Sequence, residues 1–168
     1  MKRQPLASPW RAFRRRRYTR LGQLWRDLGS IRRLRPRHAD ARATIDPSFR
    51  ERLMLVVTAV NRCRYCARFH VQVAAHSGIT AAEARALLAG VVDAVPTHEI
   101  PALLYAQRWA ERQRAPDAAA HAALAARYGP ALAQEIERVL SVIWVGNLLG
   151  NTFDYLLCRF SRGRLGCE

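Results

Sequence analysis

Two cysteines and a histidine stand close together in the stretch NRCRYCARFH, residues 61–70. Cys63 and Cys66 are three residues apart, and His70 follows four residues after Cys66. At about 100° per residue, a helix would project all three side chains from one face. Two thiols at this spacing can close a disulfide, a helix N-terminus stabilises a thiolate, and a nearby imidazole can take the thiol proton. The stretch therefore favours dithiol redox chemistry.

A histidine that moves protons is usually held by a third group, and Glu51 is the candidate here. The sequence Asn61-Arg62 predicts a break between two helices. Glu51 and His70 would then lie about 15 Å and about 13.5 Å from the break, at about 1.5 Å per residue. A helical hairpin would bring the carboxylate to the imidazole. Glu51 is thus predicted to relay protons with His70.

Two other interpretations of these residues stay open. Cys63, Cys66, His70 and Glu51 could supply four zinc ligands, although zinc sites usually add a second pair from another segment. Ligands at these spacings on one regular helix also fit a tetrahedron poorly. Alternatively, the cysteines are small apolar residues that only pack in the core.

Capping signals divide the chain into helices, and no alternating pattern predicts a strand. Asp46-Pro47 opens one helix, Gly78 closes the next, Thr80 caps a third, and Gly129-Pro130 breaks the chain before the last. The expected helices cover residues 47–60, 63–77, 81–89, 98–114, 117–128 and 131–160. We therefore expect an all-α fold, with a helical domain over residues 41–168 that carries the dithiol on a two-helix core.

The positive charge of the chain is concentrated near its N-terminus. The 168 residues carry a formal charge of +15, and residues 1–37 hold 13 Lys and Arg against one acid, which leaves +3 for the rest. Apolar residues recur at helical spacing from Trp10 to Ile31, so residues 1–40 are expected to form a basic amphipathic arm. Pro5 and Pro9 suggest that the first nine residues are disordered.

The arm has two interpretations. It could dock on nucleic acid, an anionic membrane surface or an acidic partner, or it could lay its apolar stripe on its own domain or on another subunit. No apolar run approaches the roughly 20 residues that span a bilayer, and no signal-peptide core follows the first charges. With only Cys63 and Cys66 spaced as a pair, we expect a soluble, cytoplasmic protein.

The last predicted helix contains WVGNLLGNTF, residues 144–153. Gly146 and Gly150 would permit close approach of another helix, and Asn147 needs a polar partner in this apolar setting. Asn147 or Trp144 could line a substrate pocket, or both could be buried packing residues. Further along, Cys158 is interpreted as a small apolar residue and Cys167 as a free thiol in a loose tail.

The pattern of Glu51, then Cys63-x-x-Cys66-x-x-x-His70 after a gap of twelve residues, resembles the alkylhydroperoxidase D-like (AhpD-like) thiol branch of the carboxymuconolactone decarboxylase family. The resemblance covers residues 46–88 best, is looser to residue 160 and is weak in the arm. It implies an all-helical fold and a homo-oligomer, whether dimer, trimer or hexamer. The decarboxylase branch lacks the CxxC pair, so its reaction is not expected.

The resemblance also implies roles for the residues. Cys66 would attack a hydroperoxide, Cys63 would resolve the sulfenic acid as a disulfide, and His70 with Glu51 would relay the proton. Tyr65 stands where some relatives have a second histidine. No bound cofactor is implied; an external dithiol reductant of the lipoyl or thioredoxin type would reopen the disulfide, and a peroxiredoxin could be served.

A hypothesis of a different class is a redox-sensing or disulfide-exchange module. In it the basic arm binds an anionic partner, and the dithiol only switches that binding.

Overall fold

The computed structural model describes residues 13–34, 45–115 and 117–167, and over these ranges the chain is helical with no strand. The prediction of an all-α fold is confirmed, and most helix ends lie within one or two residues of those expected. The expected disorder of the first nine residues falls outside the described ranges. The helices are α1 Leu21–Arg33, α2 Pro47–Asn61, α3 Arg64–His76, α4 Ala81–Leu88, α5 Ile100–Glu111, α6 Ala118–Tyr128 and α7 Pro130–Phe160.

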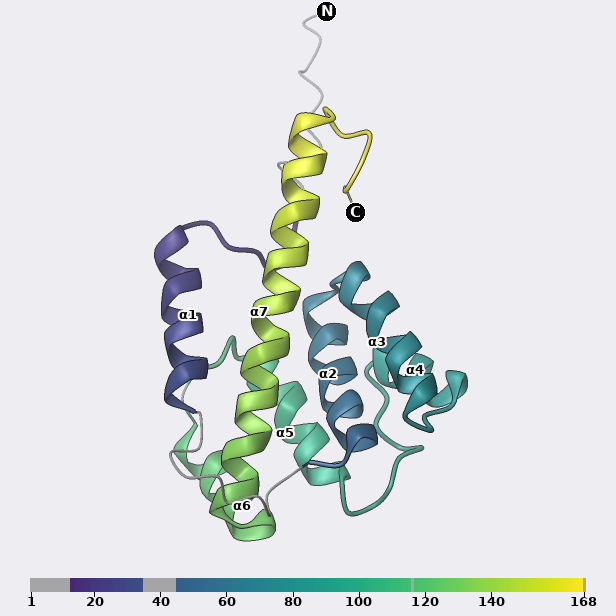
Figure 1. Ribbon diagram of the computed structural model, residues 1–168, viewed down its shortest axis with the longest axis vertical. Helices are drawn as coiled ribbons and strands as arrows, with labels where there is room; N and C mark the ends of the chain where they lie inside the picture. The colour runs from purple at the N-terminus through teal and green to yellow at the C-terminus, as the bar shows by residue number, and fades with distance from the viewer. Residues whose placement is uncertain (1–12, 35–44, 116, 168) are drawn as a thin grey trace, which may run out of the picture.

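The long helix α7 runs the length of the molecule, and its C-terminal end projects beyond the other helices (Figure 1). Helix α2 packs against α3, α4, α5 and α7, and it carries apolar residues around most of its circumference. Leu53, Leu55 and Val57 have no exposed surface. A helix that is apolar on most sides is driven to the centre of a fold. In the described part of the chain, no helix has the length and apolar character to cross a membrane.

Local capping explains where the central helices begin and turn. The Asp46 carboxylate accepts hydrogen bonds from the backbone N–H groups of Ser48 and Phe49, with Pro47 at the first helical position. Thr80 caps α4 by accepting from the Glu83 N–H. Arg62 takes a left-handed conformation, with φ of 55°, and so ends α2 and reverses the chain into α3. The predicted helical hairpin is thereby formed.

The N-terminal segment is helical only in part, because residues 13–20 are not helical and α1 begins at Leu21. Two of its arginines are bound into the fold: Arg15 pairs with Asp154, and Arg16 donates to the carbonyl oxygens of Ala110 and Glu111. Part of the basic charge of the arm therefore serves internal contacts.

The C-terminal tail contradicts the prediction of a free thiol at Cys167. Cys158 at the end of α7 forms a disulfide with Cys167, with Cα atoms 5.0 Å apart. The chain reverses after α7 through Arg162 and Gly163, which have φ of 54° and 91°. The prediction was wrong because this reversal, and not the nine-residue spacing, brings the two sulfurs together.

Candidate dithiol site

The two cysteines of the motif lie at the start of α3, where Cys63 is the N-cap and Cys66 lies in the first turn. Both thiols are free, and their sulfur atoms are 2.7 Å apart. The Cys63 side chain is fully buried, whereas Cys66 is partly exposed. Since a disulfide bond is about 2.05 Å long, closure needs a sulfur movement of less than about 1 Å. The pair is thus placed for reversible oxidation.

The pKa values of the two thiols are shifted in opposite directions. The Cys63 thiol donates a hydrogen bond to Cys66, and this bond, helped by one from Asn147, lowers the pKa of Cys66 from its ordinary value near 9 to about 7. The same hydrogen bond, together with burial, raises the pKa of Cys63 well above its usual range. Near neutral pH the chemistry therefore favours a thiolate at Cys66 and a protonated thiol at Cys63.

This asymmetry predicts a pH profile for thiol alkylation. Because only the thiolate reacts, the iodoacetamide reaction of reduced protein should rise with pH to a half-maximum near pH 7 at Cys66, where the pKa is about 7. Cys63→Ala, which removes the donor, should shift that midpoint upward, and Cys63→Ser, which keeps a hydroxyl donor, should shift it less. A wild-type midpoint near pH 9, or no shift in Cys63→Ala, would contradict the assigned cause.

The imidazole and carboxylate of the motif form a buried pair. The His70 Nδ1 atom lies 2.7 Å from Glu51 Oε2, and the two residues are 9% and 5% exposed. Glu51 comes from α2 and His70 from α3, so the hairpin produces the juxtaposition that it was expected to produce. On α3, His70 follows Cys66 by one turn, a spacing that places two side chains on the same helix face. Because Glu51 occupies Nδ1, a proton exchanged on the Cys66 side would use Nε2.

Helix α7 closes the other side of the dithiol. A Cβ atom added at Gly150 would lie 2.6 Å from Cys63 Sγ and 3.9 Å from Cys66 Sγ, so only glycine lets the helix approach this closely. A Cβ atom added at Gly146 would have no atom within 4 Å. The predicted close approach therefore depends on Gly150 alone of the two glycines.

Three other predicted residues have distinct surroundings. Asn147 is fully buried; its amide donates to Thr58, accepts from Asn61 and supports the Cys66 thiolate. The Trp144 ring packs edge-on against Trp109, 5.8 Å between centroids, which makes it part of the core. Tyr65 is 39% exposed, and its ring lies 5.8 Å from that of Phe153.

Asp154 is a residue that the sequence reasoning missed. Its carboxylate has no exposed surface, and it accepts hydrogen bonds from Tyr65 Oη at 2.7 Å and from Arg64 and Arg15, each at 2.6 Å. Tyr65 and Arg64 are the two residues between the cysteines. The available signal was an acid inside the apolar run of the last helix, because a buried carboxylate needs charged or polar partners.

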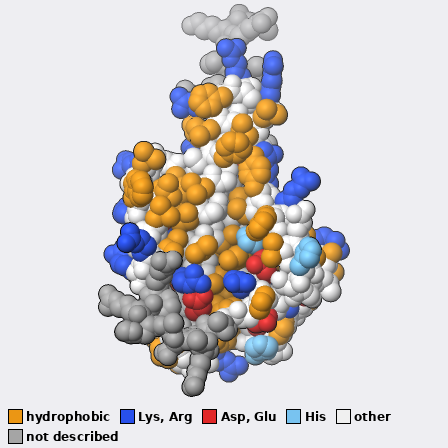
Figure 2. All heavy atoms as spheres, in the orientation of Figure 1, with side chains coloured by type: hydrophobic (Ala, Val, Ile, Leu, Met, Phe, Trp, Pro, Cys, Tyr) orange, Lys and Arg blue, Asp and Glu red, His pale blue; other side chains and the backbone are white. Residues whose placement is uncertain are grey.

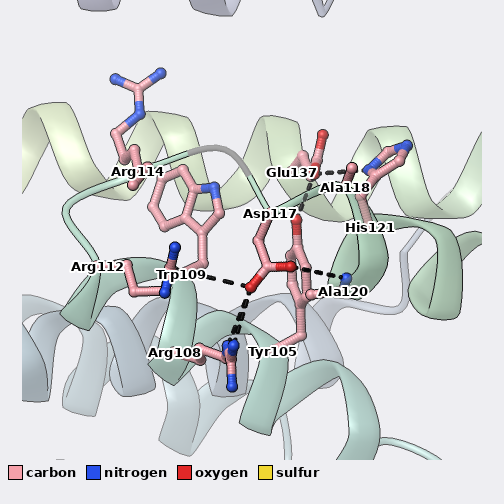
Figure 3. Close-up of a pocket in the computed structure, with 11 residues that line it drawn as sticks. Tyr105, Arg108, Trp109, Arg112, Arg114, Asp117, Ala118, Ala120, His121 and Glu137 are labelled. Atoms are coloured by element: carbon pink, nitrogen blue, oxygen red, sulfur yellow. Dashed lines mark hydrogen bonds and ion pairs between the residues drawn. The ribbon is translucent and has the colours of Figure 1, made fainter.

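A cavity of about 410 Å³ lies elsewhere, between α5, α6 and α7, and none of the motif residues lines it (Figure 3). Its polar side chains largely pair with one another. The Glu137 carboxylate accepts from Tyr105 and binds His121, and Asp117 binds Arg108. These internal pairs account for the polar character of the cavity without a ligand.

Within the described residues, no group of three or more His, Cys, Asp and Glu side chains is arranged to hold a metal ion. The Glu51 carboxylate, which the zinc interpretation needs as a ligand, instead contacts the His70 imidazole. The arrangement of these side chains therefore gives the zinc interpretation no support.

Comparison with known proteins agrees with the resemblance carried by the motif. Residues 33–112, nearly half of the chain, match the model of the carboxymuconolactone decarboxylase family, and this range contains Glu51, Cys63, Cys66 and His70. Neither a curated protein nor a solved structure gives a significant match. Residues 33–112, the part of the chain that carries the dithiol, are thus similar to the carboxymuconolactone decarboxylase family.

Proposed function

We propose that this protein reduces hydroperoxides through a dithiol–disulfide cycle of Cys63 and Cys66, assisted by His70 and Glu51. One observation carries the proposal: two free thiols lie 2.7 Å apart, and the more exposed one has its pKa lowered to about 7. The family also holds members without redox chemistry, so similarity to it alone does not supply this function. The CxxC pair distinguishes the chain from the decarboxylase branch.

The proposed cycle begins at Cys66. Its thiolate attacks the terminal oxygen of the hydroperoxide, the O–O bond breaks, and the alkoxide leaves as an alcohol after protonation, with His70 as the donor. Cys66 is then a sulfenic acid. The Cys63 sulfur attacks the Cys66 sulfur, a disulfide forms and water leaves with the thiol proton. Glu51 holds the imidazole in place through Nδ1 while the ring gives and regains its proton.

An external dithiol must return the pair to its reduced form, and we assign this role to a lipoyl or thioredoxin-type donor, with a peroxiredoxin as a protein that the cycle could serve. Exposed aromatic residues contact the motif: Phe153, 52% exposed, lies against the Tyr65 ring, and Phe69, 60% exposed, lies against the His70 ring. Such a surface suits organic hydroperoxides and a lipoyl arm better than hydrogen peroxide. Homo-oligomeric assembly and a cytoplasmic location belong to the same proposal.

The direct test is mass spectrometry of the reduced protein before and after one equivalent of an organic hydroperoxide. We expect a loss of about 2 Da on the peptide that contains Cys63 and Cys66, and hydroperoxide consumption sustained by dihydrolipoamide. Stable oxygen addition without disulfide formation, or an unchanged peptide, would contradict the proposed cycle.

A second candidate function is binding of an anionic surface by α1. This is the binding that the redox-sensing hypothesis assigns to the basic arm. Helix α1 buries none of its residues, and Leu21 and Trp25 are 76% and 69% exposed. Its Asp27 pairs with Arg114, which ties the helix to the rest of the domain. Figure 2 shows hydrophobic side chains gathered along α7 and toward α1, with Arg side chains around them. An exposed Trp and Leu among arginines suits an anionic lipid surface better than duplex DNA.

Vesicle flotation tests this second function. The protein should float with phosphatidylglycerol-containing vesicles at low salt and not with pure phosphatidylcholine vesicles. The double variant Leu21→Ser/Trp25→Ser should lose about tenfold in vesicle affinity because the inserted apolar surface is lost. Val91→Ser, also at an exposed apolar position, is the matched control and should bind normally. Binding to duplex DNA but not to vesicles would reject the lipid surface as the partner.

A further inference from the structure

The buried carboxylate of Asp154 joins three parts of the chain that are distant in sequence. Its Oδ1 atom accepts hydrogen bonds from Arg64 and Tyr65, which lie between the two reactive cysteines. Its Oδ2 atom accepts from Arg15 of the N-terminal segment. We call this set of residues, Arg15, Arg64, Tyr65 and Asp154, the Asp154 clamp. Through these hydrogen bonds, α7 is attached to the turn that carries the dithiol.

The C-terminal tail completes the clamp. Arg15 donates a second hydrogen bond, 2.9 Å long, to the carbonyl oxygen of Gly166. Gly166 is buried and lies so close to α7 that a Cβ atom there would overlap the backbone of Asp154. The neighbouring residue, Cys167, is bonded to Cys158 on α7. The disulfide thus ties the tail to α7 next to the carbonyl oxygen that Arg15 binds.

The two buried charges of the clamp depend on each other. Asp154 has no exposed side-chain surface and Arg15 has 7%, so the charge of each needs the other as its partner. Arg64, with a side chain 53% exposed, can turn to solvent. When a buried charge network is complete, it holds its members in one geometry, and a partly broken network loses that effect. The position of residues 63–66 is therefore sensitive to whether the tail is in place.

We propose that Asp154 is a positioning residue for the Cys63–Cys66 dithiol and that Cys158–Cys167 is a second redox pair that controls how firmly the clamp holds. The regulatory meaning of this inference rests on the proposed function. With the tail disulfide closed, residues 63–66 are held for rapid disulfide formation. With it open, Gly166 leaves Arg15, the clamp loosens and the first pair closes more slowly.

The redox step of the tail balances as a thiol–disulfide exchange. One thiolate of an external lipoyl-type or thioredoxin-type dithiol attacks the Cys167 sulfur, because Cys158 is fully buried and Cys167 is partly exposed. The Cys158–Cys167 bond breaks, and a mixed disulfide forms. The second donor thiol then releases Cys167, which leaves two protein thiols and one oxidised donor. In a reducing compartment such a bond responds to the redox state, so oxidising conditions would favour the fast form of the enzyme.

The first experiment measures the rate at which Cys63 and Cys66 form a disulfide with diamide as oxidant, so its readout does not depend on peroxidase activity. We expect Asp154→Asn to slow closure about tenfold, since small misplacements of reacting groups carry large rate penalties. Its Cys66 alkylation midpoint should stay near pH 7, because the hydrogen bonds from Cys63 and Asn147 that lower this pKa do not come from Asp154. A purely structural role would change the closure rate and the alkylation midpoint together. Unchanged closure in the folded variant would overturn the role of Asp154.

Tyr65→Phe is the second variant, and it removes one hydroxyl while both arginine pairs of Asp154 remain. It should also slow closure, and the double variant with Asp154→Asn should be slowed by less than the product of the single effects, because both changes act on one contact. If the closure rate of the double variant is slowed by the full product of the two single effects, the two residues act separately, and the clamp is overturned.

The second experiment tests the tail. Cys167→Ser in the full chain should slow diamide-driven closure of Cys63 and Cys66, whereas Leu165→Ser, an exposed tail position that keeps the disulfide, should not. In wild-type protein equilibrated in lipoamide redox buffers, the closure rate should follow the fraction of oxidised Cys158–Cys167. Equal closure rates in Cys167→Ser and wild type would overturn the second redox pair. A protein that passes these tests but consumes no hydroperoxide would instead overturn only the proposed function.

Discussion

Cys66→Ser is expected to abolish hydroperoxide consumption, with a rate at least about 1,000-fold below that of the wild type. The serine hydroxyl does not ionise near neutral pH, whereas the Cys66 thiol has a pKa of about 7 and is largely a thiolate above it. The measurement is the rate of loss of an organic hydroperoxide with dihydrolipoamide as reductant. Activity that persists in this variant would remove Cys66 from the reaction.

Cys63→Ser is the matched control for this experiment. The variant keeps the attacking thiol but lacks the sulfur that lies 2.7 Å from it. It should consume about one equivalent of hydroperoxide and stop, with Cys66 trapped as a sulfenic acid by dimedone. If Cys63→Ser loses the first step and Cys66→Ser retains it, the roles of the two cysteines are reversed.

The second large effect is expected at Gly150. In Gly150→Ala the new methyl group would lie 2.6 Å from Cys63 Sγ, which is closer than Cβ atoms approach sulfur, and Cys63 is fully buried. Overpacking of this kind typically costs about 1–3 kcal/mol of unfolding free energy. We also expect slower closure of the Cys63–Cys66 disulfide, because the sulfur must move. Urea denaturation and diamide-driven closure measure the two effects.

Gly146→Ala is the control, one turn earlier on the same helix, where an added methyl group meets no atom within 4 Å. Replacing a helix-interior glycine with alanine without a clash should stabilise the protein by roughly 0.5–1 kcal/mol. The two substitutions should therefore change stability in opposite directions. A shift of the same sign in both would show that helix propensity, and not contact with the dithiol, governs this segment.

The all-helical fold and the ends of most helices could be predicted because their causes are local. Asp46 and Thr80 cap their helices with backbone groups two or three residues away, as their types suggested. The N-terminal segment was less predictable, because the arginines between its apolar residues also suit tertiary contacts such as that between Arg16 and Ala110. Residues 13–20 follow those contacts and not the helical pattern.

Much of the candidate site was also local enough to predict. Cys63, Cys66 and His70 share one short helix, and Glu51 reaches His70 through a single hairpin whose turn was visible at residues 61–62. Helix periodicity and one chain reversal determine these four positions. Their spacing also carried the family resemblance that the match over residues 33–112 supports.

By itself the sequence determined the helices, the hairpin and the order of the reactive groups along it, because each depends on residues a few positions apart. Three contacts were decided only by the tertiary structure. Gly150 lies against Cys63, and the Tyr65 hydroxyl donates a hydrogen bond to Asp154. Cys167 forms a disulfide with Cys158. Tyr65 and Asp154 are 89 residues apart. No periodic pattern records such a contact, because it arises from how α7 crosses α3 and how the tail turns back, and packing of whole helices sets both.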